Sequence, residues 1–194
     1  MNKNELATRK TRQEIIDISR KKFKTKGYFN TSLQEIAQEI GLTRGALYHN
    51  FSNKKEIFFE IIKEIQAEIG DYVEMKAIEQ EDPWQQLIKG CIAFVEKAVN
   101  KDIARIMIID GPSVITWEEW KNLDAENSES HLKTQLVFLR ENYIIKNFDI
   151  DYLTSYISGG LNEIAMYISY EDNFRIKEVE QIIISMLCGL KNNG

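Results

Sequence analysis

The chain of 194 residues is 43% hydrophobic and 28% charged and contains only 2 prolines, a composition that excludes a disordered or collagen-like protein and favours helices. No segment approaches the roughly 20 apolar residues of a membrane span, and the polar N-terminal residues lack the apolar core of a signal peptide, so we expect a cytoplasmic protein with no membrane partner. The net charge of -5, taken alone, argues against nucleic-acid binding.

The first helix is predicted from apolar residues at helical spacing between Ile15 and Phe23. Thr11 and Glu14 form a capping-box pattern near its expected start. Gly27 is expected to end it, because glycine readily adopts the backbone conformation that stops a helix.

Two short helices follow the first. Ser32 and Glu35 form a capping box at the start of one, and Gly41 is expected to end it. Thr43 can cap the other, which extends to about Phe51. Their inward apolar residues predict that the three helices share one core.

A long fourth helix is predicted from a cap formed by Asn53 and Glu56, followed by apolar residues at spacings of three and four up to Val73. Asp82-Pro83 marks the start of the next helix, because proline is well placed in a first helical turn. Asp110-Gly-Pro112 predicts a turn. The remaining helices are expected over about residues 101–109, 117–142, 151–170 and 175–190.

The sequence contains no β-hairpin signal and no internal repeat, so we predict an all-α fold. A three-helix head over residues 1–55 is expected to join, through the long fourth helix, a helical body over residues 56–194. Cys91 and Cys188 lie far apart in separate apolar runs, which predicts buried reduced thiols. No cysteine or histidine spacing suits a metal ion, and we expect no metal and no cofactor.

Charge divides unevenly between the head and the body. Residues 1–55 contain 12 basic and 5 acidic side chains, whereas the rest of the chain contains 13 basic and 25 acidic ones. A basic head offers an electrostatic surface for phosphates, and an acidic body repels DNA and confines contact to the head.

Residues 32–51 have the pattern of a helix-turn-helix, with two short capped helices, a tight turn that contains glycine, and apolar residues on the inward faces. Small or hydrogen-bonding side chains occupy the outward positions of its second helix: Thr43, Arg44, Gly45, Ala46, Tyr48 and His49. Gly45 costs about 1 kcal/mol relative to alanine inside a helix. Either it lets the helix approach DNA closely, or it avoids a clash within the head, and the sequence leaves both explanations open.

This segment and its flanks resemble the TetR family of bacterial transcription regulators, over roughly the first sixty residues. The residues that carry the resemblance are Ile15, Ile18, Phe23, Gly27-Tyr28, Thr31-Ser32, Ile36-Ala37, Gly41-Leu42-Thr43, Gly45-Ala46-Leu47-Tyr48, Phe51 and Lys54. Lys22 departs from the family pattern, which usually has an apolar residue before the phenylalanine.

The resemblance implies two sets of DNA contacts. Base edges are expected at Arg44, Ala46 and His49, and phosphates at Thr43, Tyr48 and Lys54. An arginine can pair with guanine acceptors, and a tyrosine hydroxyl or a lysine ammonium suits phosphate oxygens. Thr31 and Ser32 lie at a helix N-terminus that favours an anion, although helix capping alone would also explain them.

The two C-terminal helices carry apolar residues on more than one face. The resemblance implies that they pair with their copies in a second subunit, so that a homodimer reads a palindromic site with recognition helices about 34 Å apart. The expected interface residues are Tyr156, Gly160, Ile164, Tyr167, Val179, Ile183, Met186, Leu187 and Leu190. Burial of both faces within one subunit is the alternative.

Family members usually enclose a small-molecule pocket in the body, so the resemblance adds a small apolar ligand to double-stranded DNA and a second subunit as partners. Candidate lining residues are Trp84, Phe94, Met107, Trp117, Trp120, Tyr156 and Met166, with Asn162 or Glu163 meeting a polar group. Such residues at helical spacing more often form a core, which is the alternative. The expected mechanism is repression that ends when a ligand favours the conformation with misplaced heads.

Two other classes of protein compete with a regulator. A helical enzyme is one, but no Gly-rich phosphate loop, HExxH motif or nucleophile with an adjacent base is present, so we expect no enzymatic activity. The second is a ligand-sensing module that acts through protein partners. His131, in a polar run, is expected to be a solvated surface histidine.

Overall fold

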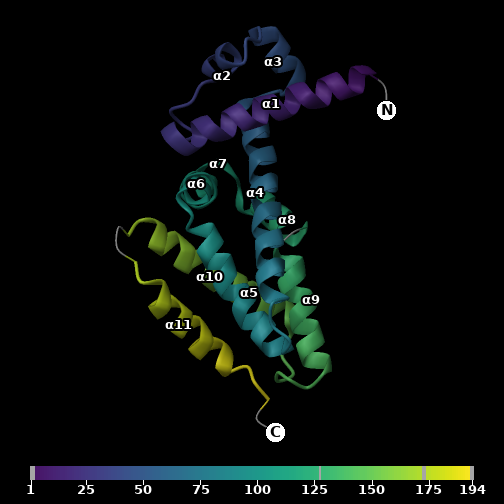
Figure 1. The fold of residues 1–194 in the computed structure, drawn as a ribbon, viewed down its shortest axis with the longest axis vertical. Helices are drawn as coiled ribbons and strands as arrows, with labels where there is room; N and C mark the ends of the chain where they lie inside the picture. The colour runs from purple at the N-terminus through teal and green to yellow at the C-terminus, as the bar shows by residue number, and fades with distance from the viewer. Residues whose placement is uncertain (1–2, 127, 172–173, 193–194) are drawn as a thin grey trace. The chain divides into compact units, whose positions relative to one another are not determined.

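The computed structural model describes residues 3–126, 128–171 and 174–192, and these residues form helices and no extended strand, which confirms the all-α class (Figure 1). The helices are α1 (Lys3–Lys26), α2 (Leu33–Glu39), α3 (Arg44–Asn50), α4 (Lys54–Ala77), α5 (Pro83–Ala98), α6 (Lys101–Ile103), the π-helix η1 (Ala104–Asp110), α7 (Gly111–Val114), α8 (Trp117–Glu126), α9 (Ser128–Glu141), α10 (Ile150–Ser169) and α11 (Ile176–Cys188). In this described part of the chain, no helix is both long and apolar enough to cross a bilayer.

The helices divide into two compact units. The first unit comprises the residues up to Ile65 together with Lys101–Thr116, and the second comprises Gln66–Asn100 together with the residues from Trp117 onward. The sequence analysis places a domain boundary between residues 55 and 56. The contacts in the structure instead divide the chain within α4 and bring residues 101–116 into the first unit, because these residues pack against α1.

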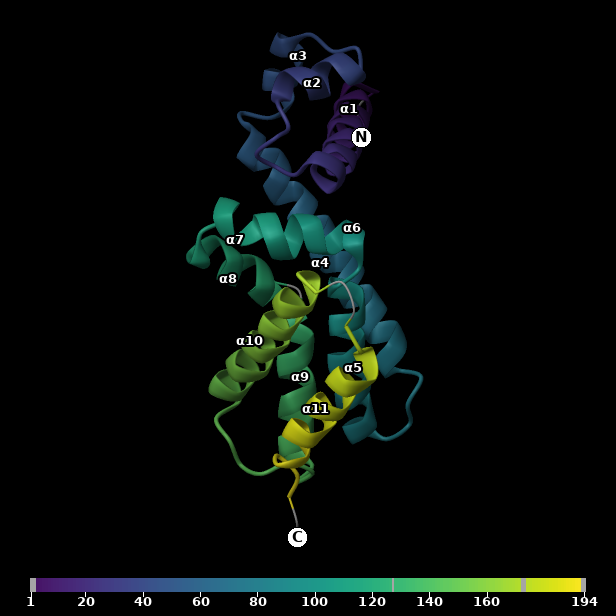
Figure 2. The same cartoon turned by 90° about the vertical axis from the view of Figure 1, so that its left-hand side faces the viewer.

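In the first unit, α2 and α3 lie on the same side of α1 (Figures 1 and 2). The core between these helices and the start of α4 contains a cluster of rings, in which the centroids of Phe23 and Phe58 are 5.6 Å apart and those of Tyr28 and Phe58 are 4.9 Å apart. Gly27 and Gly41 end α1 and α2 with φ of 82° and 68°, which confirms both predicted stops.

The predicted start of the first helix is wrong. α1 is helical from Lys3, and the Thr11 hydroxyl lies inside it and donates to the Ala7 carbonyl at 3.1 Å. Residues 3–10 contain lysine, glutamate, leucine, alanine and arginine, which are good helix formers, and no glycine or proline interrupts them. A capping-box pattern inside such a run therefore does not start a helix.

The predicted turn at Asp110-Gly-Pro112 is also wrong, because the chain passes directly from η1 into α7. Pro112 stands in the first turn of α7 and has no main-chain N–H to donate to the helical turn that precedes it. The wider π-helical turn of η1 precedes it, and the whole segment stays helical from Lys101 to Val114.

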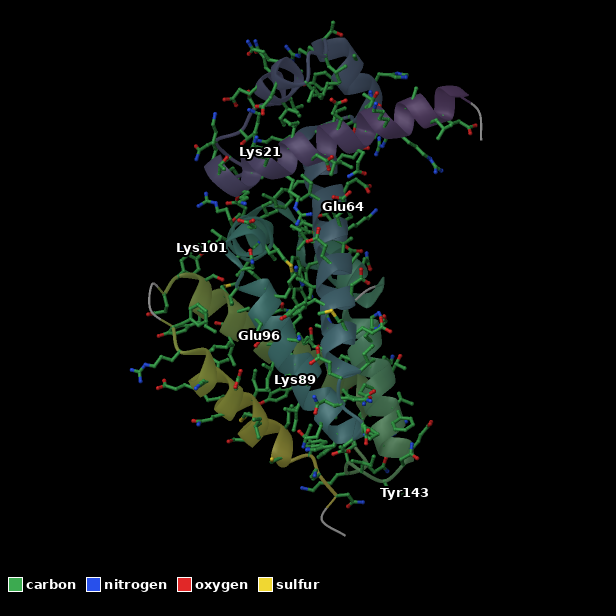
Figure 3. The ribbon with its side chains drawn as sticks, in the orientation of Figure 1. Lys21, Glu64, Lys89, Glu96, Lys101 and Tyr143 are labelled. Atoms are coloured by element: carbon green, nitrogen blue, oxygen red, sulfur yellow. The ribbon has the colours of Figure 1, made fainter. Side chains whose placement is uncertain are left out.

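In the second unit, α5 packs against α9, α10 and α11, and α9 also packs against α8 and α10 (Figure 2). The segment expected as one helix over 117–142 forms α8 and α9. Tyr143 follows α9 with a φ of 57°, and Figure 3 labels it where the chain turns toward α10. Cys91 is buried as predicted, but Cys188 is exposed, so that prediction is wrong for the second thiol.

Candidate nucleic-acid interface and cavity

The start of α2 is held by a complete capping box. The Ser32 hydroxyl accepts from the Glu35 main-chain N–H at 3.2 Å, and the Glu35 carboxylate accepts from the Ser32 N–H at 2.9 Å. The Ser32 N–H, followed by Lys26, lowers the pKa of the Glu35 carboxyl to about 2. The Thr31 side chain is buried, and its hydroxyl donates to the Gly27 carbonyl at 2.9 Å. Both hydroxyls therefore have structural roles beside the predicted phosphate contact.

α3 contains five of the residues that are predicted to contact DNA, Arg44, Gly45, Ala46, Tyr48 and His49. Thr43 caps it by accepting from the Ala46 N–H at 3.1 Å, as predicted. Leu47 is fully buried and fixes the inward side, so that Arg44, Gly45 and His49 are exposed on the other sides. Tyr48 is 42% exposed, and the Arg44 guanidinium lies 5.4 Å from its ring centroid.

Gly45 has open space beside it. The nearest heavy atom to a Cβ built at this position, outside the local backbone, is the Thr43 Oγ1 at 4.0 Å, which is ordinary van der Waals contact. A clash within the head therefore does not explain this glycine. Close approach of another molecule to α3, the other explanation, stays a prediction.

Lys54 anchors the loop between α1 and α2. Its ammonium donates to the carbonyls of Tyr28 and Thr31, each at 2.8 Å, and lies 4.1 Å from the Tyr28 ring centroid. Partial burial lowers the pKa of Lys54. An ammonium has three donors, so these two bonds leave one for a phosphate oxygen.

A surface hollow of about 570 Å³ brings several of the predicted DNA-binding residues together. It is lined by Phe29, Asn30, Thr31, Ser32, Leu33, Gln34, Glu35, Arg44, Tyr48 and Lys54. Thr43, Gly45, Ala46 and His49 lie on or next to α3 outside this lining. Phe29, which was not among the predicted residues, is 64% exposed in this lining, and no local sequence signal distinguishes it from the neighbouring Tyr28.

Two basic residues of α1 contact the ends of α2 and α3, the helices that carry this hollow. Arg12 donates to the Asn50 carbonyl at the end of α3, and its guanidinium lies 4.0 Å from the Phe51 ring centroid. Lys22, the departure from the family pattern, forms an ion pair with Glu39 at the end of α2. These contacts fix α2 and α3 on α1, and the sequence analysis assigned neither of them.

The segment Lys101–Thr116 contacts the loop before α2 within the first unit. The Asp110 carboxylate is buried, accepts from the Tyr28 N–H at 2.8 Å and lies 3.6 Å from the Arg105 Nε. The Arg105 guanidinium occupies the space that a Cβ on Gly27 would need. Tyr28 is thus held through its N–H by Asp110 and through its carbonyl by Lys54.

The second unit contains a cavity of about 510 Å³ between α4, α5, α9 and α10. It is lined by Gly70, Val73, Glu74, Ala77, Ile78, Gln86, Leu87, Gly90, Cys91, Phe94, Ser130, His131, Leu132, Thr134, Gln135, Ser158 and Leu161. Burial raises the pKa of the Cys91 thiol to about 12, so this side chain contributes an apolar, protonated surface. His131 is exposed as predicted, but it also lines the cavity.

Of the predicted ligand-lining residues, Phe94 lies in the lining of this cavity. Trp84 and Met107 are buried, Met107 in the first unit, and Trp117 and Tyr156 are exposed by 73% and 68%. Trp120, Asn162 and Met166 are half-buried. The Asn162 Oδ1 is buried without a hydrogen bond to any described residue.

The predicted dimer residues lie on α10, on α11 and just after α11, and they fall into three groups by exposure. Tyr156, Gly160, Tyr167 and Met186 are exposed, Ile164, Val179 and Leu190 are half-buried, and Ile183 and Leu187 are buried. α11 packs on α5, so burial within one subunit accounts for Ile183 and Leu187. The exposed side chains of Tyr152, at 80%, and Ile182, at 52%, add to the apolar surface that the sequence analysis described.

These features define a helix-turn-helix DNA-binding protein with a second, helical unit that contains a cavity. Residues 15–61 match the family described as bacterial regulatory proteins of the tetR family, and residues 84–190, more than half of the chain, match the tetracyclin repressor-like C-terminal domain. The chain belongs to the TetR family of transcription regulators, which confirms the resemblance found in its first sixty residues.

Individual relatives agree with this assignment. The transcriptional regulator AcrR of Shigella flexneri is 34% identical over 107 residues, 55% of this chain and 50% of AcrR, so the match spans half of that relative's length. The TetC protein of transposon Tn10 from Escherichia coli is 25% identical over 81% of this chain and 79% of TetC. A TetR-family regulator from Pectobacterium atrosepticum superimposes with a TM-score of 0.82 at 26% identity over 98% of both chains.

Proposed function

We propose that this protein is a cytoplasmic repressor that binds a palindromic DNA operator as a homodimer and releases it when a small ligand occupies the cavity of the second unit. The observation that carries the DNA-binding part is the exposed surface of α3, where Arg44, Tyr48 and His49 surround a glycine with open space beside it. A glycine there lets the helix backbone approach a groove, while arginine and tyrosine supply base and phosphate contacts.

Dimerisation is supported by the apolar side chains that α10 and α11 expose, among them Tyr156, Tyr167, Ile182 and Met186. Large apolar side chains gathered on neighbouring helices are typical of a protein interface. A second copy of the chain is the occupant that the family membership favours. Two recognition helices in one dimer read two half-sites, which gives a specificity that one short helix cannot reach.

For a ligand to release the operator, its binding in the cavity must change the position of α3. We assign the transmission of this change to Lys101–Thr116. This segment follows directly after α5, whose Leu87, Cys91 and Phe94 line the cavity. It also holds the loop before α2 through the buried Asp110 carboxylate and the Tyr28 N–H. A ligand that binds better to one arrangement of this segment shifts the population of operator-competent molecules.

Selection from a pool of random duplex DNA tests the proposal. We expect the purified protein to enrich a palindrome, and the double variant Arg44→Ala, Tyr48→Ala to lose that enrichment. Lys21→Ala is a suitable control, because Lys21 is an exposed basic residue of α1 outside the hollow (Figure 3). A protein that enriches no sequence at low salt contradicts the proposal.

The salt dependence of binding separates a repressor from a ligand-sensing module that acts through proteins. Contacts of basic residues such as Lys54 with phosphates release counterions, so the observed association constant should fall steeply as salt rises. Binding to the selected duplex that does not change with salt would favour the module.

A further inference from the structure

We propose that the cavity of the second unit takes an apolar organic cation, an inference that rests on its proposed role as the ligand site. The cavity wall is largely apolar, with Val73, Leu87 and Phe94 among its lining residues, so a bound molecule must bury a hydrophobic body. The charge of the ligand is then decided by the few polar groups that share this wall.

The charged lining is one-sided. Among the described residues that line the cavity, Glu74 is the one carboxylate and His131 the one histidine, and neither lysine nor arginine occurs. Lys89 lies on α5, where Figure 3 labels it, but it does not belong to the lining. A bound anion finds no lysine or arginine in this lining, whereas a bound cation can pair with the carboxylate of Glu74, an exposed side chain of the lining.

The lysines on the helices around the cavity have acidic partners of their own. Lys76 of α4 lies 2.8 Å from Glu79, and Lys133 of α9 lies 2.5 Å from Asp151. These pairs neutralise the basic residues nearest in sequence to Glu74 and to His131. No ion pair to Glu74 forms within the described residues, so its carboxylate is available to a ligand.

The uncharged polar groups of the lining are compatible with a positively charged ligand. The Gln86 amide nitrogen donates to the Gln80 carbonyl, and the Gln135 amide nitrogen donates to the Pro83 carbonyl, both at 2.9 Å. The Thr134 hydroxyl donates to the Ser130 carbonyl at 2.8 Å. Each of these side chains keeps an acceptor oxygen that a cation can approach, and each glutamine amide also keeps one N–H.

The net charge of the second unit also favours a cation over an anion. Its sequence contains 20 acidic and 10 basic side chains, the reverse of the balance in residues 1–55. A surface of this sign raises the local concentration of small cations and repels anions. The cavity therefore attracts a cation from a distance and can pair with it at Glu74.

Two pairs of probes test the inference, since the members of each pair have a similar shape and opposite charge. They are tetraphenylphosphonium with tetraphenylborate, and benzyltrimethylammonium with phenylmethanesulfonate. Calorimetry on the full-length protein without DNA measures binding directly. We expect the cation of at least one pair to bind ten times or more tighter than its anion, and Glu74→Gln to weaken that cation at least tenfold.

Asp71→Asn is the matched control, because Asp71 is an exposed acidic residue of the same helix that does not line the cavity. It removes the same charge from the surface and should leave cation binding unchanged. Anions that bind as tightly as cations, cation binding that Glu74→Gln leaves unchanged, or no binding of any probe would each overturn the inference. Operator binding without a ligand, measured in the same preparations, would survive all three outcomes, whereas its absence would overturn the regulator proposal instead.

Discussion

α3 in the first unit and α11 in the second are both short helices with one buried side, yet their exposed sides differ in chemistry. α3 buries Leu47 and exposes Arg44 and His49, whereas α11 buries Leu187 and exposes Ile182 and Met186. A polar surface with basic groups suits a hydrated, charged polymer, and an exposed apolar surface is stabilised when another protein covers it, at about 25 cal/mol per Å². The partner of such a helix is therefore set by the chemistry of its exposed surface and not by its length or by its burial.

The largest effect is expected from placing charges on the exposed apolar surface of α11. The double variant Ile182→Glu, Met186→Glu places two charges on the exposed surface of α11, where an apolar contact with a second copy cannot tolerate them. We expect a monomer in sedimentation experiments. Operator affinity should fall by about 100-fold or more, because the two half-sites are no longer bound together.

Gln181→Glu is the control for this prediction, since it adds one acid at an exposed polar position of the same helix. It should leave both the dimer and operator binding unchanged. A double variant that sediments as a dimer at low micromolar concentration would show that another surface joins the subunits.

A smaller effect, on stability, is expected inside the first unit. Asp102 and Asp110 of the segment Lys101–Thr116 both contact residues near the end of α1. Asp110 is 5% exposed and accepts from the Tyr28 N–H, while Asp102 forms an exposed ion pair with Lys24. Asp110→Ala leaves a partly buried N–H without its partner and should lower the free energy of unfolding by about 1–3 kcal/mol. Asp102→Ala should cost less than about 1 kcal/mol, because solvent screens the pair.

Urea unfolding of both variants checks this difference, and amide exchange at Tyr28 locates it. Exchange at this amide should be faster in Asp110→Ala and unchanged in Asp102→Ala. Equal losses of stability in the two variants would mean that the buried carboxylate does not hold the loop before α2.

The smallest effect is expected at the polar surface of α3. Gly45→Ala adds one methyl group in open space, so it should raise the stability of the protein by up to about 1 kcal/mol. If α3 approaches DNA at this point, the same methyl group should weaken operator binding about tenfold, or roughly 1.4 kcal/mol. Thermal unfolding and operator titration measure the two effects separately.

Gly70→Ala is the matched control, because Gly70 is also helical and also has open space beside it; since Gly70 lines the cavity, operator binding is compared without a ligand. It should raise stability by a similar amount and leave operator binding unchanged. If both variants bind the operator as tightly as the unmodified protein, Gly45 has no role in the approach to DNA.

Several features were determined by the sequence alone, because they depend on residues that are neighbours along the chain. The Ser32–Glu35 capping box, the Thr43 cap and the stops at Gly27 and Gly41 all have the predicted geometry. Each involves a turn of backbone and a side chain within three or four residues. The all-α class and the helix-turn-helix follow from these signals together with the helical spacing of apolar residues.

Local patterns failed where a longer context decided the structure. The capping box at Thr11 lies inside α1, because the residues before it favour a helix equally well. The exposure of Cys188 could not be predicted from the apolar residues around it, since these cover more than one face of α11 and only one face is packed on α5.

The tertiary structure decided which groups meet across long separations in the chain. Asp110 binds the Tyr28 N–H 82 positions away, and Lys54 reaches the Tyr28 carbonyl 26 positions away. The cavity likewise draws its lining from four helices, so Phe94 enters it while Trp84, on the same helix, does not. Helical periodicity predicts which face of a helix is apolar, but the packing of the other helices determines whether that face meets a core, a cavity or solvent.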